Sequence, residues 1–582
     1  MTRPELPGRS AVGIVLATMA STSLTSLLLL VLAVAVVLSE AQLQLAETFC
    51  DATCPQAASI VQQKDIEVKR PLVRIFSHHG RYFSELEELK VTGDAGLNNF
   101  TGSIPSELGN LTKIKFLHLG NNALEREFPV ELASLSKLEF LNINLGNNSL
   151  TGEIPPEFGG LENLEYLRLH VNVLTGGIPP ELGRLQKMVY LILHSNNLTG
   201  TIPASLANCS SLRNIRLSNN ELTGTVTQID FLQLRSLESF SVNGNQLGGG
   251  FPVSVYNCTD LKLLDLSSNG FSGELPDNYE YSQPVLRDLR VLGLSSNKFG
   301  GSVPGWIWKL PELQVLDLSH NSFTGVWPTN LSGLEGFSRL EASPDDAGGG
   351  SSVSNNNNPT QVEGEGRKLF EQISIQAKGL RLVYEYVLET LISIDLSYNQ
   401  LSGRLPYALE ALRGLTYLNL AHNNFSGEIP QVFGNLLLLQ SLDLSANYLT
   451  GKIPAVLTRP SLGYLNLSYN FLEGEIPTAN AFSTRYDISS FKPGNNQLCG
   501  PPLETTCVSS NASGSSATLR APSSKLLDGT FWLAFEIGTA IGVVIMVGTL
   551  SAIPFTRHRL LHPQDFARRS KHLSYGVFRE PT

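Results

Sequence analysis

The amino-acid sequence predicts a solenoid of stacked coils with one long parallel sheet, followed by a single transmembrane helix. Along most of the 582 residues an asparagine recurs at intervals of about 24 residues, each time after the pattern Leu-x-x-Leu-x-Leu. Near the C-terminal end, residues 531–555 form an apolar run about as long as a helix needs to cross a membrane. The first observation predicts the solenoid, and the second predicts the membrane span.

The repeated unit is typified by the segment from Leu164 to Pro179. Its period lies in the range of leucine-rich repeats, and about fourteen copies occur. Their asparagines are Asn98, Asn122, Asn148, Asn172, Asn196, Asn220, Asn245, Asn269, Asn297, Asn321, Asn399, Asn423, Asn447 and Asn470. We therefore predict an α/β-type leucine-rich-repeat solenoid that is right-handed and curved.

The spacing of the leucines explains why such repeats stack. In Leu-x-x-Leu-x-Leu the apolar side chains point into the coil and the intervening ones face solvent, as in a short strand. Neighbouring coils pair these strands in parallel and bury the leucines in one continuous core, which no single repeat can do alone. The asparagine amide offers donors and an acceptor to backbone groups where the coil turns, so we expect a ladder of buried amides.

Several further motifs resemble those of plant receptor-like proteins, which are receptors without a kinase domain. The repeat tails Leu198 to Pro203 and Leu449 to Pro454 are similar to the Leu-x-Gly-x-Ile-Pro signature of the plant-specific repeat class. The period breaks between Asn321 and Asn399, where residues 343–358 are rich in Gly, Ser and Asn and indicate a flexible loop. After that loop, the stretch from Lys378 to Tyr384 resembles an element of the family's island domain.

The resemblance implies the following domain organisation. We expect a signal peptide at 1–41, an N-terminal cap at 42–90, repeats 1–10 at 91–330, an island at 331–388, repeats 11–14 at 389–480, a C-terminal cap and juxtamembrane spacer at 481–530, the transmembrane helix at 531–555 and a cytoplasmic tail at 556–582. The cap departs from the family pattern, because residues 55–90 contain no Trp and no further Cys. The start of the solenoid is therefore less well defined than its repeats.

The two apolar segments predict a single-pass type I protein of the plasma membrane, with its N-terminus outside the cell. The first follows Arg3 and Arg9 and ends in small residues that fit a signal-peptidase site; a retained signal anchor is the alternative. Basic residues follow the second segment and place that side in the cytoplasm. The remaining tail is too short for a kinase, so we expect no enzyme activity and no cofactor. A longer transcript that adds a kinase is the alternative.

Charge and cysteine content narrow the function further. A net charge of -10 with 16% charged residues argues against a nucleic-acid partner. In a secreted chain, Cys499 and Cys507 are expected to form a disulfide that closes the last coil. Cys50 and Cys54 are close enough to pair, but their pairing stays open. Cys209 and Cys258 lie about two repeats apart, beyond the reach of a disulfide, and are expected to be buried thiols rather than metal ligands.

Asn-x-Ser/Thr sequons recur along the expected extracellular part, and glycosylation at several of them would agree with that location. The candidates are Asn99, Asn110, Asn147, Asn197, Asn330, Asn424, Asn466 and Asn511.

The outward-facing strand positions suggest where a ligand binds. Later repeats carry the uniform sequence Asp-Leu-Ser, whereas earlier ones carry aromatic, arginine and histidine side chains, and Tyr, Trp and Arg are enriched at binding hot spots. The candidate ligand-binding residues are Phe116, His118, Tyr166, Arg168, His170, Tyr190, His194, Asn214 and Arg216. The histidines on adjacent strands could tune binding at mildly acidic pH. The alternative is that these solvent-facing positions simply vary.

The resemblance also implies partners. By this resemblance, receptor-like proteins borrow a kinase from a membrane partner, and the island helps to bind the ligand and a co-receptor kinase. Lys378 and Tyr384 are at the matched positions, and docking of the island on the solenoid is the alternative role for them. Within the span, Gly538 and Gly542 form a small-xxx-small motif that lets two helices approach closely, and Glu536 lies near its outer end. We therefore expect a receptor that senses an extracellular peptide, protein or glycan in defence or development. The alternative is a membrane-tethered inhibitor of a cell-wall hydrolase.

Overall fold

The computed structural model describes residues 88–90, 101–110, 114, 116–135, 141–277, 286–338, 370–377, 380–386, 391–459 and 461–507. The chain divides into two units, Met1–Val508 and Ser509–Thr582, and every described residue belongs to the first. The signal peptide, the Cys50 and Cys54 pair and the apolar segment 531–555 lie outside the described residues. Within the described residues, no helix combines the length and apolar character needed to cross a bilayer.

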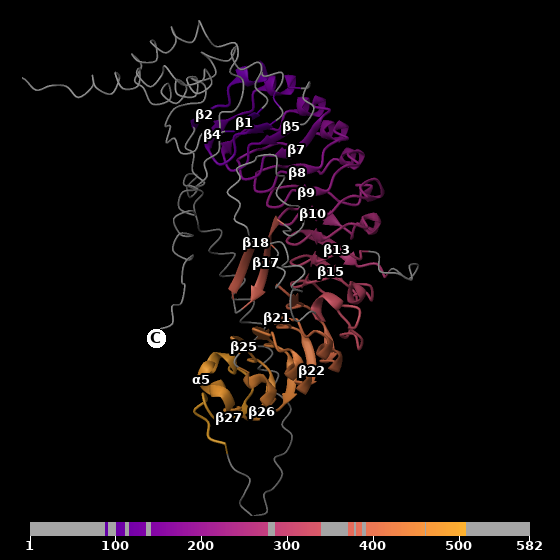
Figure 1. The fold of residues 1–582 in the computed structure, drawn as a ribbon. Coiled ribbons are helices and arrows are strands. Elements are labelled where there is room, and N and C mark those ends of the chain that lie inside the picture. Colours follow the sequence, from indigo (N-terminus) through magenta and orange to yellow (C-terminus); the bar gives the residue numbers. More distant parts are fainter. Residues whose placement is uncertain are drawn as a thin grey trace, which may run out of the picture. The chain divides into compact units, whose positions relative to one another are not determined.

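One parallel sheet of fourteen strands runs through the whole solenoid, and its strands follow one another along the arc in Figure 1. Each of its strands pairs in parallel with the next coil's strand. The strands are β1 (Glu88–Lys90), β3 (Phe116–His118), β5 (Leu141–Asn144), β7 (Leu164–Arg168), β8 (Tyr190–Ile192), β9 (Asn214–Arg216), β10 (Ser239–Ser241), β12 (Leu263–Asp265), β14 (Val291–Gly293), β16 (Val315–Asp317), β19 (Ser393–Asp395), β21 (Tyr417–Asn419), β23 (Ser441–Asp443) and β25 (Tyr464–Asn466). The predicted repeat solenoid is confirmed.

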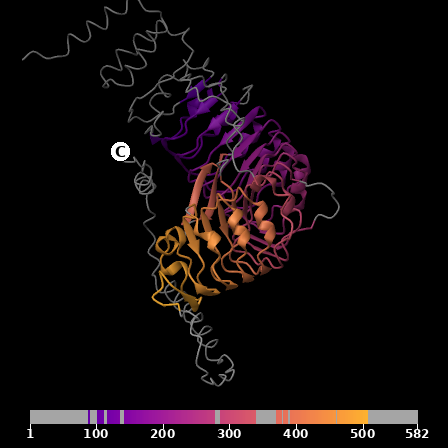
Figure 2. The same cartoon turned by 60° about the horizontal axis from the view of Figure 1, so that its bottom comes forward.

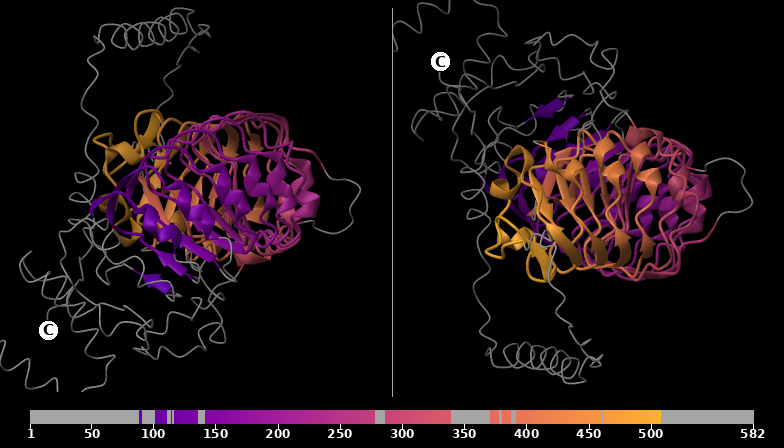
Figure 3. Two further views of the ribbon diagram at one scale, coloured as in Figure 1. Left: turned by 90° about the horizontal axis from the view of Figure 1, so that it is seen from above. Right: turned by 90° about the horizontal axis from the view of Figure 1, so that it is seen from below.

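The leucines of the repeat form a single core along the stack. In the fourth coil Leu164, Leu167, Leu169 and Leu174 are fully buried, and the equivalent residues of neighbouring coils belong to the same cluster. Seen from above and below, successive coils lie over one another (Figure 3). A repeated pattern of inward-facing residues requires this stacked arrangement.

The repeat asparagines form the predicted ladder of amides, and from Asn148 to Asn470 each one also bonds to a neighbouring coil. The Nδ2 atom of Asn172 donates to the carbonyl oxygens of Leu169, in its own coil, and of Leu145, in the preceding coil, both at 3.0 Å. Its Oδ1 atom accepts from the backbone N–H of Leu150, also at 3.0 Å. The pattern recurs down the stack to Asn470 and then at Asn495, whose Oδ1 accepts from the N–H of Leu472.

The tail signature Leu-x-Gly-x-Ile-Pro has a structural reason at each fixed position. In the tail from Leu198 to Pro203, the leucine and Ile202 are buried, Gly200 has a positive φ of 73°, and the proline directly precedes a 3-10 turn. Glycine adopts a positive φ without the steric cost that a Cβ would add. The same tails also pair with one another and build short secondary sheets beside the main one.

These secondary sheets contain three groups of strands. They are β2 (Thr101–Gly102), β4 (Ala123–Arg126) and β6 (Ser149–Leu150); β11 (Gly248–Gly249), β13 (Gly270–Glu274) and β15 (Lys298–Gly300); and β20 (Ser402–Arg404), β22 (Asn424–Glu428), β24 (Tyr448–Gly451), β26 (Phe471–Glu475) and β27 (Gln497–Cys499). Figure 2 shows the last group from a turned viewpoint.

The helical parts of the coils are 3-10 turns, so the α/β-type prediction was right for the strands and wrong for the helices. Each turn has only three to five residues, too few for an α-helix to return the chain across a coil of this length. The turns are η2 (Ser106–Asn110), η3 (Val130–Ser134), η4 (Pro156–Gly160), η5 (Pro180–Arg184), η6 (Ala204–Asn208), η7 (Phe231–Gln233), η8 (Val253–Asn257), η9 (Ile307–Lys309), η10 (Glu335–Ser338), η11 (Tyr407–Ala411), η12 (Gln431–Asn435) and η13 (Ala455–Thr458).

The interruption of the repeats leaves the main sheet intact. Strand β16 before the break pairs directly with β19 after it, and Asp317 lies opposite Asp395. Within the break, β17 (Phe370–Ala377) and β18 (Leu380–Tyr386) form an antiparallel hairpin, and β17 lies beside β19 and β21. Tyr384 is on β18 opposite Ile373, whereas Lys378 lies outside the described residues.

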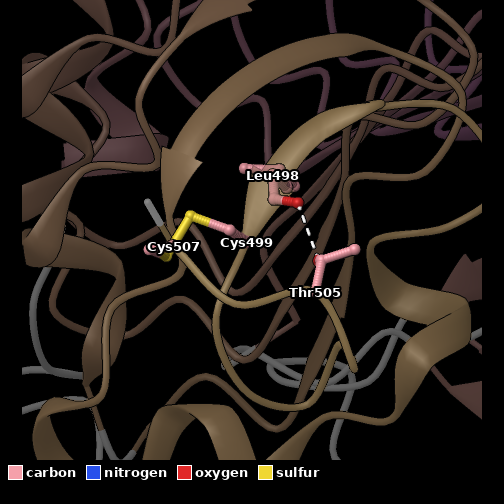
Figure 4. Close-up of a disulfide and its surroundings, with 4 residues drawn as sticks. All are labelled: Leu498, Cys499, Thr505 and Cys507. Atoms are coloured by element: carbon pink, nitrogen blue, oxygen red, sulfur yellow. Dashed lines mark hydrogen bonds between the residues drawn. A yellow bond between two sulfur atoms is a disulfide. The ribbon is translucent and has the colours of Figure 1, made fainter. Parts of the chain in front are cut away.

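The C-terminal end of the stack is closed by a short cap. It consists of η14 (Ala479–Ala481), α5 (Phe482–Arg485), η15 (Ile488–Ser490) and β27, and Phe482 and Phe491 are fully buried against the last coil. Cys499 and Cys507 form the predicted disulfide (Figure 4). Figure 4 also shows Thr505 Oγ1, which donates a hydrogen bond to the carbonyl of Leu498. Cys209 and Cys258 are buried free thiols, as predicted.

Candidate functional site

Seven of the candidate residues come from three successive coils of the concave sheet, at β7, β8 and β9 (Figure 1). We call these residues the concave patch: Tyr166, Arg168, His170, Tyr190, His194, Asn214 and Arg216. The strand register aligns them in columns, because parallel strands pair residue by residue. One column holds Tyr166, Tyr190 and Asn214, and the next holds Arg168, Ile192 and Arg216.

The two tyrosines of the patch form a stacked pair with an arginine beside it. The ring centroids of Tyr166 and Tyr190 are 4.9 Å apart with an interplanar angle of 11°. The Arg168 guanidinium carbon lies 5.8 Å from each centroid, within the range of a cation–π contact. On the third coil, Arg216 Nε donates to Asn214 Oδ1 at 3.0 Å. Ring stacking and this hydrogen bond hold the long side chains in place.

The two histidines stack on each other on adjacent coils. Their ring centroids are 4.9 Å apart, and His194 Nδ1 lies 3.2 Å from Ser195 Oγ. The His170 ring lies over Gly146, where a Cβ atom would be only 2.3 Å from the ring carbon Cε1. His170 Nδ1 is buried without a hydrogen-bond partner. Glycine at 146 therefore makes room for the histidine pair, a requirement that the sequence pattern did not reveal.

Both histidines are held neutral. Burial and the nearby positive charges of Arg168 and Arg216 lower the pKa of His170 to about 4. Burial, His170 and Arg216 lower the pKa of His194 to about 3. A neutral imidazole is therefore present throughout the mildly acidic range, which does not support the expectation that histidine protonation tunes binding there.

The other candidate positions are described less fully. Phe116 and His118 lie on β3, where the backbone continues the same columns, but their side chains are outside the described part of the structure. Glu536, Gly538 and Gly542 are also outside it.

The later coils replace the patch with buried aspartates. Asp395 Oδ1 accepts from the N–H and the hydroxyl of Ser397, and its Oδ2 accepts from Asn419 Nδ2. Burial and the neighbouring carboxyl of Asp317 raise the pKa of Asp395. Because these carboxyl oxygens are engaged by their own coil and by the next one, the aspartates act as structural parts of the repeat, as the sequence indicated.

A second aromatic stack was missed at the sequence level. His320, Tyr398 and His422 stack with centroid separations of 4.2 and 4.1 Å, across the break that the island makes in the sequence. All three occupy the position just before the repeat asparagine and have positive φ values of 52–55°. That position is exposed, and its variability hides it from a search for conserved pattern residues.

The described sequons differ in accessibility. Asn110, Asn147, Asn197, Asn330 and Asn424 are exposed. Asn466 differs, since it lies half-buried on β25 with its amide hydrogen-bonded to Asp443 and Ser468. Asn99 and Asn511 lie outside the described residues.

Comparisons with known proteins give the family. Two family models, described as "Leucine rich repeat" and "Leucine Rich Repeat", match the chain. The chain contains leucine-rich repeats and is similar to plant receptor-like proteins. The first model matches residues 285–343, and the second matches residues 137–161, 163–185, 187–209, 260–281, 390–412, 414–436 and 438–459.

Plant receptors are among the similar proteins. The leucine-rich-repeat chain is 32% identical to Receptor-like protein 7 of Arabidopsis thaliana over 108 residues, which are 19% of this chain and 10% of that protein. It is 27% identical to a chain in the crystal structure of PEPR1–AtPEP1, with a TM-score of 0.54 and coverage of 69% of this chain and 47% of that one. A TDR receptor is also 27% identical, with a TM-score of 0.51 and coverage of 70% and 63%. The chain thus spans less than two thirds of each of these relatives.

Proposed function

We propose that this leucine-rich-repeat protein is a cell-surface receptor that binds an extracellular ligand on the concave patch. The ordered cluster of Tyr166, Arg168 and Tyr190 is the observation that carries the proposal. Aromatic and arginine side chains dominate binding hot spots, and pre-ordered side chains lose less entropy when a ligand binds. The likeness to plant receptors supports the same reading.

Signalling is proposed to pass through a partner kinase in the plasma membrane, as the resemblance to plant receptor-like proteins implies. Gly538 and Gly542 would allow the partner's helix to approach closely, with Glu536 near the outer end of the contact. Lys378 and Tyr384 are proposed to serve the island's contact with a co-receptor. If Gly538 and Gly542 are replaced by leucine, co-precipitation of the partner kinase should decrease; an unchanged yield would remove the helix contact from the proposal.

Ligand binding is tested with the full chain at the cell surface. Replacement of Tyr166, Arg168, Tyr190 and Arg216 by alanine should abolish binding of ligands found in a screen of microbial and endogenous peptides, proteins and glycans, while surface expression remains normal. A matched control replaces two tyrosines and two arginines that are exposed elsewhere. These are Tyr407, Tyr448, Arg184 and Arg404. Equal binding by both variants would show that the ligand binds elsewhere.

The alternative, a tethered inhibitor of a cell-wall hydrolase, predicts that the full chain slows a microbial hydrolase directly. The same pair of variants separates the two functions. Inhibition that is lost in the patch variant, with no recruitment of a kinase, would favour the inhibitor.

A further inference from the structure

We propose that Tyr448 and Phe471 form an aromatic platform that binds the first two sugars of an N-linked glycan on Asn424. This inference rests on the proposed cell-surface function, because only a secreted chain meets the enzymes that glycosylate Asn-x-Ser/Thr sequons. It adds a structural role for one glycan and names what covers an exposed apolar surface. The three residues lie on β22, β24 and β26, in the secondary sheet of the last coils (Figure 2).

The two rings of the platform are stacked on each other and largely exposed. Their centroids are 6.1 Å apart with an interplanar angle of 13°. Tyr448 is 54% exposed and Phe471 is 62% exposed, whereas the next residue of each strand, Leu449 or Leu472, is buried. Two adjacent exposed rings make a continuous apolar surface, which is more typical of a binding site than of isolated surface residues.

The sequon of Asn424 lies on the same face of the sheet, on the strand next to the tyrosine. Along β22 Asn424 is exposed, Phe425 is buried and Ser426 is half-buried, so the asparagine and the serine both face outward. Ser426 pairs directly with Tyr448 on β24. Strand spacing and rise then place the backbones of Asn424 and Tyr448 within roughly 8 Å of each other. A sugar attached to the asparagine therefore starts beside the tyrosine ring.

The chemistry of an N-glycan core suits two rings in a row. The core begins with two β-linked N-acetylglucosamine units, and each pyranose ring presents C–H bonds on its flat faces. These apolar faces can stack on aromatic rings, while the hydroxyl groups at the ring edges stay in water. Tyr448 lies on the strand next to the sequon, and Phe471 lies on the strand beyond it. We therefore assign the first sugar to Tyr448 and the second to Phe471.

The sequon of Asn197 provides a matched comparison within the same chain. Asn197 is exposed and directly follows a repeat asparagine, as Asn424 does. In the two coils after it, the places of the two rings are taken by Glu221 and Gln246, which are also exposed. These polar side chains have no flat apolar face, so a glycan on Asn197 should not be held by stacking.

The test measures how fast the native chain loses each glycan. The full chain is produced in eukaryotic cells restricted to high-mannose glycans, purified in detergent and treated with endoglycosidase H, which cuts between the first two sugars. A stacked core must leave the platform before it is cut. Replacing both rings by alanine (Tyr448→Ala with Phe471→Ala) should therefore speed release at Asn424 by about two- to ten-fold, the range expected for one aromatic contact. Release at Asn197 should not change.

The matched control exchanges the two rings, Tyr448→Phe with Phe471→Tyr, and so keeps both aromatic faces. Release at Asn424 should stay as slow as in the wild-type chain. Site-specific mass spectrometry gives the rates at both sites in one sample, and the rate at Asn197 reports any general loosening of the fold.

The possible results separate this inference from the proposed function. Equal release at Asn424 from the wild-type chain and the alanine variant would overturn the platform, and so would equal acceleration at both sites. If Asn197 carries a glycan and Asn424 does not, the platform is wrong and the cell-surface proposal stands. A chain without glycan at either site would contradict both. If the alanine variant loses co-precipitation of a membrane kinase with no change in release, the rings bind a protein partner and not the glycan.

Discussion

Replacement of Asn399 by alanine tests how strongly the asparagine ladder holds the solenoid together across the island. Asn399 Nδ2 donates to the carbonyls of Leu318, Leu396 and Ser397 at 3.0–3.1 Å, and its Oδ1 accepts from the N–H of Phe323 at 2.9 Å. Truncation leaves the Phe323 N–H buried without a partner, at a cost of about 1–3 kcal/mol. Loss of the bond to Leu318 adds about 1 kcal/mol. We expect the free energy of unfolding to fall by about 2–4 kcal/mol.

Urea unfolding followed by tryptophan fluorescence measures this change, because Trp308 and Trp327 are buried in the adjoining coils, with ring centroids 5.9 Å apart. The matched control is Gln400→Ala, at the exposed neighbouring position, which should change the free energy of unfolding by less than about 0.5 kcal/mol. If Asn399→Ala costs less than about 1 kcal/mol, the amide ladder is not a major source of cohesion between the coils, since that is the worth of one ordinary hydrogen bond.

Three further predictions concern acid, reduction and glycans. His170 and His194 have lowered pKa values in the fold, so as pH falls below 6.5 the unfolded chain binds protons that the folded chain does not. The folded state therefore loses stability as pH falls from 6.5 towards about 4 and 3, and the double glutamine variant should show a flatter stability profile in acid melts. An unchanged profile would contradict the burial of the pair. Cys507→Ser opens the terminal disulfide and should lower the free energy of chemical unfolding by about 2–3 kcal/mol; an unchanged value would show that the cap is stable without the bridge. Mass spectrometry of the chain from eukaryotic cells should find glycan on exposed Asn424 and not on half-buried Asn466; comparable occupancy would show that the β25 amide is accessible during folding.

Much of the fold could be predicted because one short pattern specifies it many times. Leu167 and Leu169 are inward because of their spacing, and Asn172 bonds across coils because its amide recurs at every turn. The pattern does not specify the returning segment, since five residues such as η5 (Pro180–Arg184) are compatible with several local conformations. The 3-10 geometry there depends on how closely adjacent coils approach.

The sequence predicted which residues of the candidate site lie together, but not their protonation states. Strand alternation places Tyr166 and Tyr190 on the same face, so their proximity follows from the sequence. The neutral state of His170 does not, because it depends on burial by neighbouring coils and on charges 48 residues apart in the chain, at Arg168 and Arg216. The aromatic stack that joins His320 to Tyr398 was also hidden, since only the continuous sheet shows that these two coils are neighbours.

Because β16 pairs directly with β19, the island is an insertion that the main sheet does not need for its continuity. The Oδ1 atom of Asn399 reaches the backbone of Phe323 just as each amide does in uninterrupted repeats, although the two residues are separated by 76 positions. Mutations or changes of length between these coils would leave the supporting frame in register. A lineage of such repeat proteins can therefore diversify that segment rapidly, while the stacked coils keep the same fold.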